Sequence, residues 1–252
     1  MGATARSTEG VVRLTMLPPF GNTSEQRSAH IHRTWGIIEG VGVNVVRINP
    51  APPRVRIMPG FARDADPQRG YFPFESFRNI VERYKPRVAI NGTYFNMVNG
   101  QPTGSIVRFD TFLYQGQCGT AIRFYEDGRI NFRFPNEPDH YSFQDVQHAI
   151  CTGPTLVRDG KFYLYPRAEG FYDPGVLGTA RRSAIGLTKS GKVLLVTVHT
   201  EIPLETLARI MVRLDCRHAA NLDGGSSSAL YSNGAYITVP GRKLSNVILV
   251  YD

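Results

Sequence analysis

The run Asp223-Gly224-Gly225-Ser226-Ser227-Ser228 holds the residues best suited to chemistry in this chain of 252 residues. A short apolar segment precedes the run, which predicts that Asp223 stands at the end of a strand. The two glycines allow the backbone to turn sharply and to approach a ligand closely. Amide N–H groups and the three serine hydroxyls beside the carboxylate would suit sugar hydroxyls or phosphate oxygens. The alternative is a Gly/Ser hairpin loop with a solvated Asp.

Two further strand ends carry small polar residues. Residues 87–90 lead into Asn91-Gly92-Thr93-Tyr94-Phe95, which offers an amide and a hydroxyl beside a glycine. Residues 148–150 lead into Cys151-Thr152-Gly153-Pro154. We expect these two segments and the end at Asp223 to line one cleft. A tight turn is an adequate explanation for the Asn91 segment taken alone.

Charged residues mark two other strand ends. Arg181 and Arg182 begin an apolar strand, and because successive strand residues point to opposite faces, only one of them can face a given cleft. A guanidinium is well matched to phosphate or carboxylate, although a solvated Arg at a strand end is the simpler interpretation. His199-Thr200-Glu201 follows strand 194–198 and precedes a helix, so His199 or Glu201 is a candidate for the site. Thr200 or Glu201 could equally serve to start that helix.

The remaining pattern predicts an α+β fold with a largely antiparallel or mixed β-sheet core, flanking helices and a single domain. Asp-Gly, Ser-Gly or Asn-Gly turns join the two strands of each of four expected hairpins. These hairpins are 122–125 with 129–132, 155–157 with 162–164, 184–187 with 193–196, and 229–231 with 236–237. Apolar residues at helical spacing predict helices over 74–85, which Pro86 stops, and over 203–216.

Composition limits the classes of function. The chain is 42% hydrophobic and 20% charged, as in an ordinary globular protein, and no apolar window reaches the 18 residues of a membrane span. Its formal net charge of +8 favours acidic partners, but the basic residues are scattered, which argues against nucleic acid. The three cysteines have no metal-like spacing, and Cys118 and Cys216 are expected to be small buried hydrophobes. The N-terminus lacks the apolar region of a signal peptide.

Four segments, taken in order, resemble the phosphodiester glycosidase family. They are Ala89 to Phe95, Thr152 to Lys161, Arg182 to Gly186, and Asn221 to Ser228. The resemblance spans residues 41–252 and leaves residues 1–40 as an N-terminal extension, expected to pack on the domain. The family often has a third glycine at Ser226, Ser-Thr at Ser228-Ala229 and Asp-Gly at His199-Thr200. The last of these departures points to a different substrate.

The resemblance implies a hydrolase that cleaves the glycosidic C–O bond of a sugar-1-phosphodiester and releases sugar and a phosphomonoester. It makes Asp223 the catalytic carboxylate, Arg182 the cation for the phosphate and Glu201 the reserve second carboxylate. The implied substrate-binding residues are Asn91, Gly92, Thr93, Tyr94, Thr152, Gly153, His199, Gly224, Gly225, Ser226, Ser227 and Ser228. We expect no metal and no cofactor.

Other expectations and two alternatives accompany this interpretation. The partner would be a sugar phosphodiester or glycoconjugate, and the family resemblance implies an extracytoplasmic or secreted protein. One alternative is a non-catalytic module that binds glycan or cell envelope on the same fold. The other is a phosphodiesterase that cleaves P–O, although no metal cluster supports a metal-dependent one.

Overall fold

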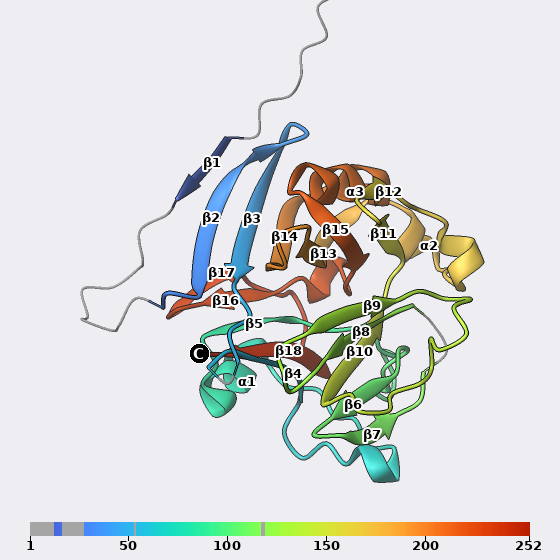
Figure 1. Ribbon diagram of the computed structural model, residues 1–252. Coiled ribbons are helices and arrows are strands. Elements are labelled where there is room, and N and C mark those ends of the chain that lie inside the picture. The colour runs from blue at the N-terminus through green and yellow to red at the C-terminus, as the bar shows by residue number, and fades with distance from the viewer. Residues whose placement is uncertain (1–12, 17–27, 53, 117–118) are drawn as a thin grey trace, which may run out of the picture.

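The computed structural model describes residues 13–16, 28–52, 54–116 and 119–252. Cys118 and most of the N-terminal extension lie outside these residues. Three sheets, antiparallel at every strand pairing, form the described part of the chain (Figure 1). This architecture confirms the predicted α+β fold class, and the predicted sheet core is divided among the three sheets.

The largest sheet has eight strands, and the other two have five each. The eight-stranded sheet runs in the order β1 (Arg13–Met16), β2 (Ile31–Ile38), β3 (Val41–Ile48), β14 (Val193–Ile202), β13 (Ala180–Thr188), β15 (Cys216–Asn221), β11 (Thr155–Arg158) and β12 (Lys161–Phe162). The second sheet, called the β10 sheet, runs β7 (Thr111–Tyr114), β6 (Ile106–Arg108), β10 (His148–Thr152), β8 (Thr120–Phe124) and β9 (Ile130–Arg133). The third, the β5 sheet, runs β17 (Ala235–Thr238), β16 (Leu230–Ser232), β5 (Val88–Asn91), β18 (Asn246–Tyr251) and β4 (Arg56–Phe61).

All four predicted hairpins are present. They are β8 with β9, β11 with β12, β13 with β14, and β16 with β17. The turn between β16 and β17 shows why its sequence is suitable, because Asn233 and Gly234 both have positive φ, at 46° and 86°. That geometry is the one that two-residue hairpin loops require.

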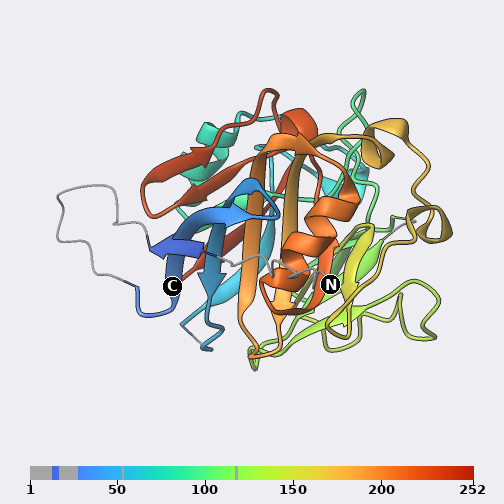
Figure 2. The same cartoon turned by 90° about the horizontal axis from the view of Figure 1, so that it is seen from above.

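Helices cover the outer faces of two sheets. Helix α1 (Phe77–Tyr84) begins three residues later than predicted, because the Ser76 side chain caps it by accepting the Asn79 N–H at 3.2 Å. It packs on the β5 sheet through buried Ile80 and Val81. Helix α3 (Leu204–Arg213) lies on the eight-stranded sheet (Figure 2) and ends before predicted, because the chain already enters β15 at Cys216.

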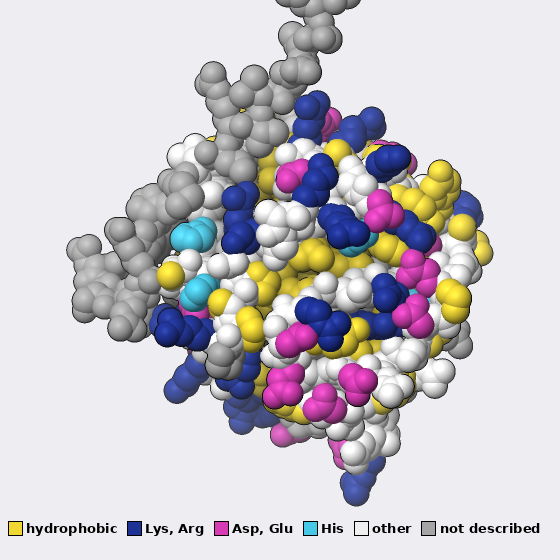
Figure 3. Space-filling view, viewed as in Figure 1, with side chains coloured by type: hydrophobic (Ala, Val, Ile, Leu, Met, Phe, Trp, Pro, Cys, Tyr) yellow, Lys and Arg dark blue, Asp and Glu magenta, His cyan; other side chains and the backbone are white. Residues whose placement is uncertain are grey.

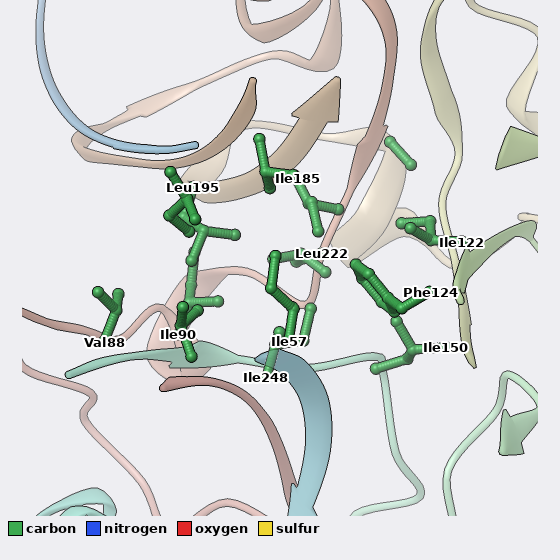
Figure 4. Packing of buried hydrophobic residues seen from close by; sticks show 14 of the residues in the cluster. Ile57, Val88, Ile90, Ile122, Phe124, Ile150, Ile185, Leu195, Leu222 and Ile248 are labelled. Atoms are coloured by element: carbon green, nitrogen blue, oxygen red, sulfur yellow. The ribbon is translucent and has the colours of Figure 1, made fainter. Parts of the chain in front are cut away.

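The main hydrophobic core lies between the eight-stranded sheet and the other two sheets. Figure 4 shows Ile185 and Leu195 from the first sheet facing Ile90 and Ile248 from the β5 sheet and Ile122 from the β10 sheet. Burial of this apolar surface is the dominant favourable contribution to folding. The core therefore fixes the relative positions of the three sheets, and with them the strand ends that carry the polar segments.

Shorter elements complete the chain. Helix α2 (Pro174–Leu177) and 3-10 turns at Pro67–Arg69, Pro166–Glu169 and Gly225–Ser227 lie in the connections. None of the helices in the described residues is long and apolar enough to span a membrane. On the face in Figure 3, Lys and Arg side chains are spread among Asp and Glu side chains and do not form a single block.

Candidate active site

The structure brings together the three strand ends that the sequence singled out. The end of β5 meets the segment after β15, because the Asp223 N–H donates to the Gly92 carbonyl at 3.0 Å. The end of β10 meets β15 in turn, because the Thr152 hydroxyl donates to the Asn221 carbonyl at 2.8 Å. Residues from three segments that lie far apart in sequence thus surround one place in the fold.

Asn91 holds both ends of the loop that carries Asp223. Its side-chain Nδ2 donates to the Asp223 carbonyl at 2.6 Å, and its Oδ1 accepts the Ala229 N–H at 2.9 Å. Asn91 is 1% exposed, so its bond to Ala229 is buried and its bond to Asp223 is partly buried. The amide of Asn91 is therefore used in closing loop 223–229.

A second amide holds the segment after Asn91. Asn246 Oδ1 accepts the Thr93 N–H at 2.8 Å, and its Nδ2 donates to the Thr93 carbonyl at 3.1 Å. This contact passes so close to Gly92 that a Cβ there would lie 2.0 Å from Asn246 Oδ1. Only a glycine at position 92 leaves room for this contact. The Thr93 hydroxyl is buried and has no hydrogen-bond partner among the described residues.

Asp223 is a half-buried carboxylate whose protonation is strongly perturbed. Its Oδ1 accepts the Gly224 N–H at 2.8 Å. Burial raises the pKa of its carboxyl to about 6, against opposing effects from Ser227, the Gly224 N–H and the Arg242 guanidinium. The Ser227 hydroxyl favours the charged form by its proximity but forms no hydrogen bond of normal geometry in the described structure. A carboxyl with this pKa can exchange a proton near neutral pH.

The glycine and serine run forms a tight 3-10 turn beside this carboxylate. Gly225 has φ of +57°, and the N–H groups of Ser227 and Ser228 donate back to the carbonyls of Gly224 and Gly225 at 3.0 and 3.2 Å. The hydroxyls of Ser227 and Ser228 are buried without a hydrogen-bond partner among the described residues, whereas Ser226 is exposed. Buried hydroxyls of this kind gain free energy when a ligand bonds to them.

Asn221 connects the other two polar segments. Its Nδ2 donates to the Tyr94 hydroxyl at 2.5 Å and to the Gly153 carbonyl at 3.4 Å. The Tyr94 ring lies against Phe171, with ring centroids 5.9 Å apart, and a Cβ at Gly153 would lie 2.9 Å from the Phe171 ring, which would have to shift. Asn221 Oδ1 is buried and has no hydrogen-bond partner among the described residues, so this group has an acceptor to offer.

Arg182 is held by the backbone of the protein itself. It is 1% exposed, and its guanidinium donates to the carbonyls of Ile202 at 3.0 Å, Val176 at 3.1 Å and Gly178. Burial lowers the pKa of this guanidinium. These bonds tie the end of β14 to helix α2, which makes Arg182 a positioning residue in this arrangement.

The neighbouring Arg181 points to the other face of β13, as strand alternation requires. Its Nη2 donates to the carbonyls of Ser228 and Val239, both at 3.1 Å, so its guanidinium lies beside the serine run. The backbone carbonyl of Arg181 lies 2.8 Å from where a Gly224 Cβ would stand. Gly224 is therefore required by close contact with β13.

His199 and Glu201 lie on β14, two strands away from β15, the strand that leads to Asp223. Both are exposed on β14, which pairs with β13, and β13 in turn pairs with β15. Two strand spacings amount to roughly 9–10 Å between backbones. His199 Nε2 lies 3.3 Å from the Thr238 hydroxyl, and partial burial of the ring, together with the positive charge of Arg181, lowers the pKa of the imidazole. The structure shows no contact between Asp223 and either residue among the described side chains.

Sequence reasoning missed Arg242, whose positive charge lowers the pKa of the Asp223 carboxyl without an ion pair between the two side chains in the described part of the chain. It follows β17 in the segment 239–243, which is tied to the serine run because the Gly241 N–H donates to the Ser226 carbonyl at 2.8 Å. Arg242 Nη1 also contacts, at 2.8 Å, the sulfur of Met97, which lies in the segment that follows Tyr94. A Pro-Gly pair before two basic residues marks a turn, but it carries no sign of what lies opposite.

Glu169 was missed as well. It is 7% exposed, and its Oε2 accepts the Thr155 N–H and hydroxyl, both at 2.9 Å, behind the turn that contains Gly153. Burial raises the pKa of this carboxyl. Across residues 13–16, 28–52, 54–116 and 119–252, no group of three or more His, Cys, Asp or Glu side chains is arranged to hold a metal ion.

Comparison with known proteins places most of the chain in one family. The phosphodiester glycosidase family matches residues 84–251. Human N-acetylglucosamine-1-phosphodiester alpha-N-acetylglucosaminidase is 24% identical over 194 residues, covering 66% of this chain and 38% of the human protein. The bovine protein of the same name is 24% identical over 193 residues, covering 66% and 37%. The match thus spans less than half the length of these relatives.

Solved structures share the fold. A hypothetical protein from Synechocystis superimposes with a TM-score of 0.76 at 19% identity, covering 89% of this chain and 62% of that chain. The zebrafish N-acetylglucosamine-1-phosphodiester alpha-N-acetylglucosaminidase catalytic domain, auto-inhibited by its pro-peptide, superimposes with a TM-score of 0.67 at 19% identity. That match covers 100% of this chain and 87% of the zebrafish chain. At these identities the likeness establishes the fold.

Proposed function

The chain belongs to the phosphodiester glycosidase family, and from this premise we propose that it hydrolyses the glycosidic C–O bond of a sugar-1-phosphodiester. The observation that carries the proposal is the half-buried Asp223 carboxylate at the meeting of the polar strand ends, close enough to Arg242 for that guanidinium to lower its pKa. Hydrolysis of a sugar phosphodiester needs a carboxylate near the anomeric carbon and a cation near the phosphate. Asp223 and Arg242 are the candidates for these two charges, because the segment that carries Arg242 is bonded through Gly241 to Ser226, in the loop that follows Asp223.

The proposed reaction uses one water molecule. Its oxygen attacks C1 of the sugar, and Asp223 takes the proton that water loses. The bond between C1 and the phosphate oxygen breaks, and its electron pair stays on that oxygen. The phosphomonoester departs as a stable anion, so a strong general acid matters less than in ordinary glycoside hydrolysis. A carboxyl pKa of about 6 suits Asp223 to accept this proton near neutral pH.

The other residues divide into ligands and supports. Arg242 is assigned to the phosphate, because Arg182 is 1% exposed and bonded to three backbone carbonyls, and Arg181 is bonded to two. The unpartnered hydroxyls of Thr93, Ser227 and Ser228 and the Asn221 Oδ1 are assigned to sugar hydroxyls or phosphate oxygens. Asn91, Gly92, Tyr94, Thr152, Gly153, Gly224 and Gly225 are assigned to shaping the site. His199, Glu201 and Ser226 are assigned to its rim.

The substrate to test first follows from the mammalian relatives, whose names specify an N-acetylglucosamine-1-phosphodiester. Release of N-acetylglucosamine would be measured from UDP-N-acetylglucosamine and from N-acetylglucosamine-1-phospho-methylmannoside. Wild type would be compared with Asp223→Asn, which keeps the shape of the side chain. Asp110→Asn, at an exposed position in the turn between β6 and β7, is the matched control.

The expected result is turnover by wild type and by the control, and a loss of at least about 100-fold in Asp223→Asn. Reaction in ¹⁸O-labelled water should place the label in the sugar, since C–O cleavage adds water to C1. Label in the phosphate would instead establish a phosphodiesterase that cleaves P–O. Saturable glycan binding without turnover would establish a binding module on this fold.

A further inference from the structure

A groove lies between the start of α1 and segment 239–243, and Arg242 is one of the residues that line it. Its volume is about 350 Å³, and its walls include Ser76, Phe77, Arg78, Tyr236, Arg242 and Lys243. Arg242 and Gly241 line this groove, and the Gly241 N–H donates to the carbonyl of Ser226, three residues after Asp223, at 2.8 Å. The groove therefore adjoins the loop that carries the candidate catalytic carboxylate.

The walls of this groove are positively charged. Arg78, Arg242 and Lys243 line it, and none of the residues that line it carries a carboxylate. The only salt bridge that these three residues form within the described structure is between Arg78 and Glu82, both exposed, with 4.0 Å between nitrogen and oxygen. A pair of that kind compensates little charge. A ligand in the groove would gain from negative charge.

Apolar and aromatic groups form the rest of the surface. Tyr236 lies beside Phe77, with ring centroids 6.2 Å apart, and the Arg78 guanidinium lies 4.8 Å from the Tyr236 ring centroid. Val239 is 64% exposed at the rim. Cations above an apolar wall fit a ligand that joins an anionic group to a ring-shaped body.

The position of the groove assigns it to one half of the substrate. If Arg242 holds the phosphate of a sugar phosphodiester at Asp223, the sugar lies on the carboxylate side and the leaving group extends past Arg242 into the groove. Resting on the proposed function, we propose that this groove binds the leaving group and prefers one with a second anionic group next to a ring. Arg78 and Lys243 are then specificity residues for this second charge.

Two substrates with the same sugar test the preference. In UDP-N-acetylglucosamine the group beyond the first phosphate carries a second phosphate and a nucleoside, whereas in N-acetylglucosamine-1-phospho-methylmannoside it is neutral. Wild type should have the higher kcat/KM for the charged substrate. Lys243→Gln and Arg78→Gln should each lower the ratio of the two kcat/KM values about fivefold, since each removes one charge contact. Raising the salt concentration should also lower the ratio in wild type.

Lys161→Gln on β12, exposed and outside the groove, is the matched control and should leave the ratio unchanged. A ratio that neither groove variant alters, or a wild-type preference for the neutral leaving group, overturns the inference while the glycosidase stands. Absence of turnover on both substrates counts against the proposed function. Calorimetric titration with UDP then tests the groove separately: weaker binding in Lys243→Gln and Arg78→Gln is expected, and unchanged affinity in both overturns it.

Discussion

Asn91 and Asp223, which lie 132 positions apart in the chain, are joined by a hydrogen bond of 2.6 Å from the side-chain amide of the first to the carbonyl of the second. The same amide accepts the Ala229 N–H, so a single side chain closes loop 223–229 at both ends. The position of the candidate catalytic carboxylate is thereby set from a different sheet. Catalysis is sensitive to such positioning, because misplacement by about 1 Å can cost about 100-fold in rate.

We predict that Asn91→Ala lowers both stability and activity. The substitution leaves the Asp223 carbonyl and the Ala229 N–H buried without their partner, which should reduce the free energy of unfolding by about 2–4 kcal/mol. Denaturant unfolding measures the loss, and sugar release at a temperature where the variant is folded measures the activity. Asn79→Ala, at an exposed position on α1, should change neither quantity. Full activity in folded Asn91→Ala would show that the loop does not need this clamp.

Gly92→Ala should be destabilising for a steric reason. The added Cβ would stand 2.0 Å from Asn246 Oδ1, so the hydrogen bonds between Asn246 and Thr93 must shift or break. We expect a loss of about 2–4 kcal/mol in the free energy of unfolding. Gly42→Ala on β3 is the matched control, because its Cβ would meet only Trp35, at an ordinary 3.7 Å. Equal melting temperatures for the two variants would contradict this reading of the site.

The local part of the fold could be predicted from the sequence. Hairpins depend on neighbouring residues, so turns such as Asn233-Gly234 identified four of them correctly. The meeting of the segments at Asn91, Thr152 and Asp223 was also expected, because each is a strand end with small polar residues. The division of the core into three sheets was not, since alternation identifies a strand without identifying its neighbours.

The contacts of the charged residues could not be predicted from the sequence. Alternation predicts that Arg181 and Arg182 point to opposite faces, but it cannot tell which face is the site. The carbonyls of Val176 and Gly178 that hold Arg182 come from a connecting segment with no regular pattern. Arg242 comes near the loop that carries Asp223 because the Gly241 N–H bonds to the Ser226 carbonyl, a contact that no local signal encodes.

Arg182 and Arg242 should respond differently to substitution. Arg182→Ala leaves three backbone carbonyls without their donor and should reduce the free energy of unfolding by at least about 3 kcal/mol. Arg242→Ala should change stability by no more than about 1 kcal/mol, but should lower kcat/KM by about 100-fold. Arg209→Ala, exposed on α3, is the control for both measurements. A stable Arg182→Ala variant without activity would return the phosphate-binding role to Arg182.

The pKa of Asp223 gives activity and stability opposite dependences on pH. Because the carboxylate is the form that accepts a proton, kcat/KM should rise as pH increases through about 6 and then level off. Burial raises the folded-state pKa above its unfolded value, so folding favours the protonated form. That contribution to stability is complete below pH 4 and is lost as pH rises through about 6. Asp223→Asn lacks the titration.

Unfolding measured at pH 4 and pH 7.5 checks the second dependence. From pH 4 to pH 7.5, the unfolding free energy of Asp223→Asn should increase by about 1–3 kcal/mol relative to the change in wild type. The upper end corresponds to the full pKa shift, and partial exposure of the side chain reduces it. Asp110→Asn should show no such change, because its carboxyl is exposed. If the unfolding free energy of wild type instead increased more than that of Asp223→Asn from pH 4 to pH 7.5, the folded protein would stabilise the charged carboxylate. A different group would then have to accept the proton.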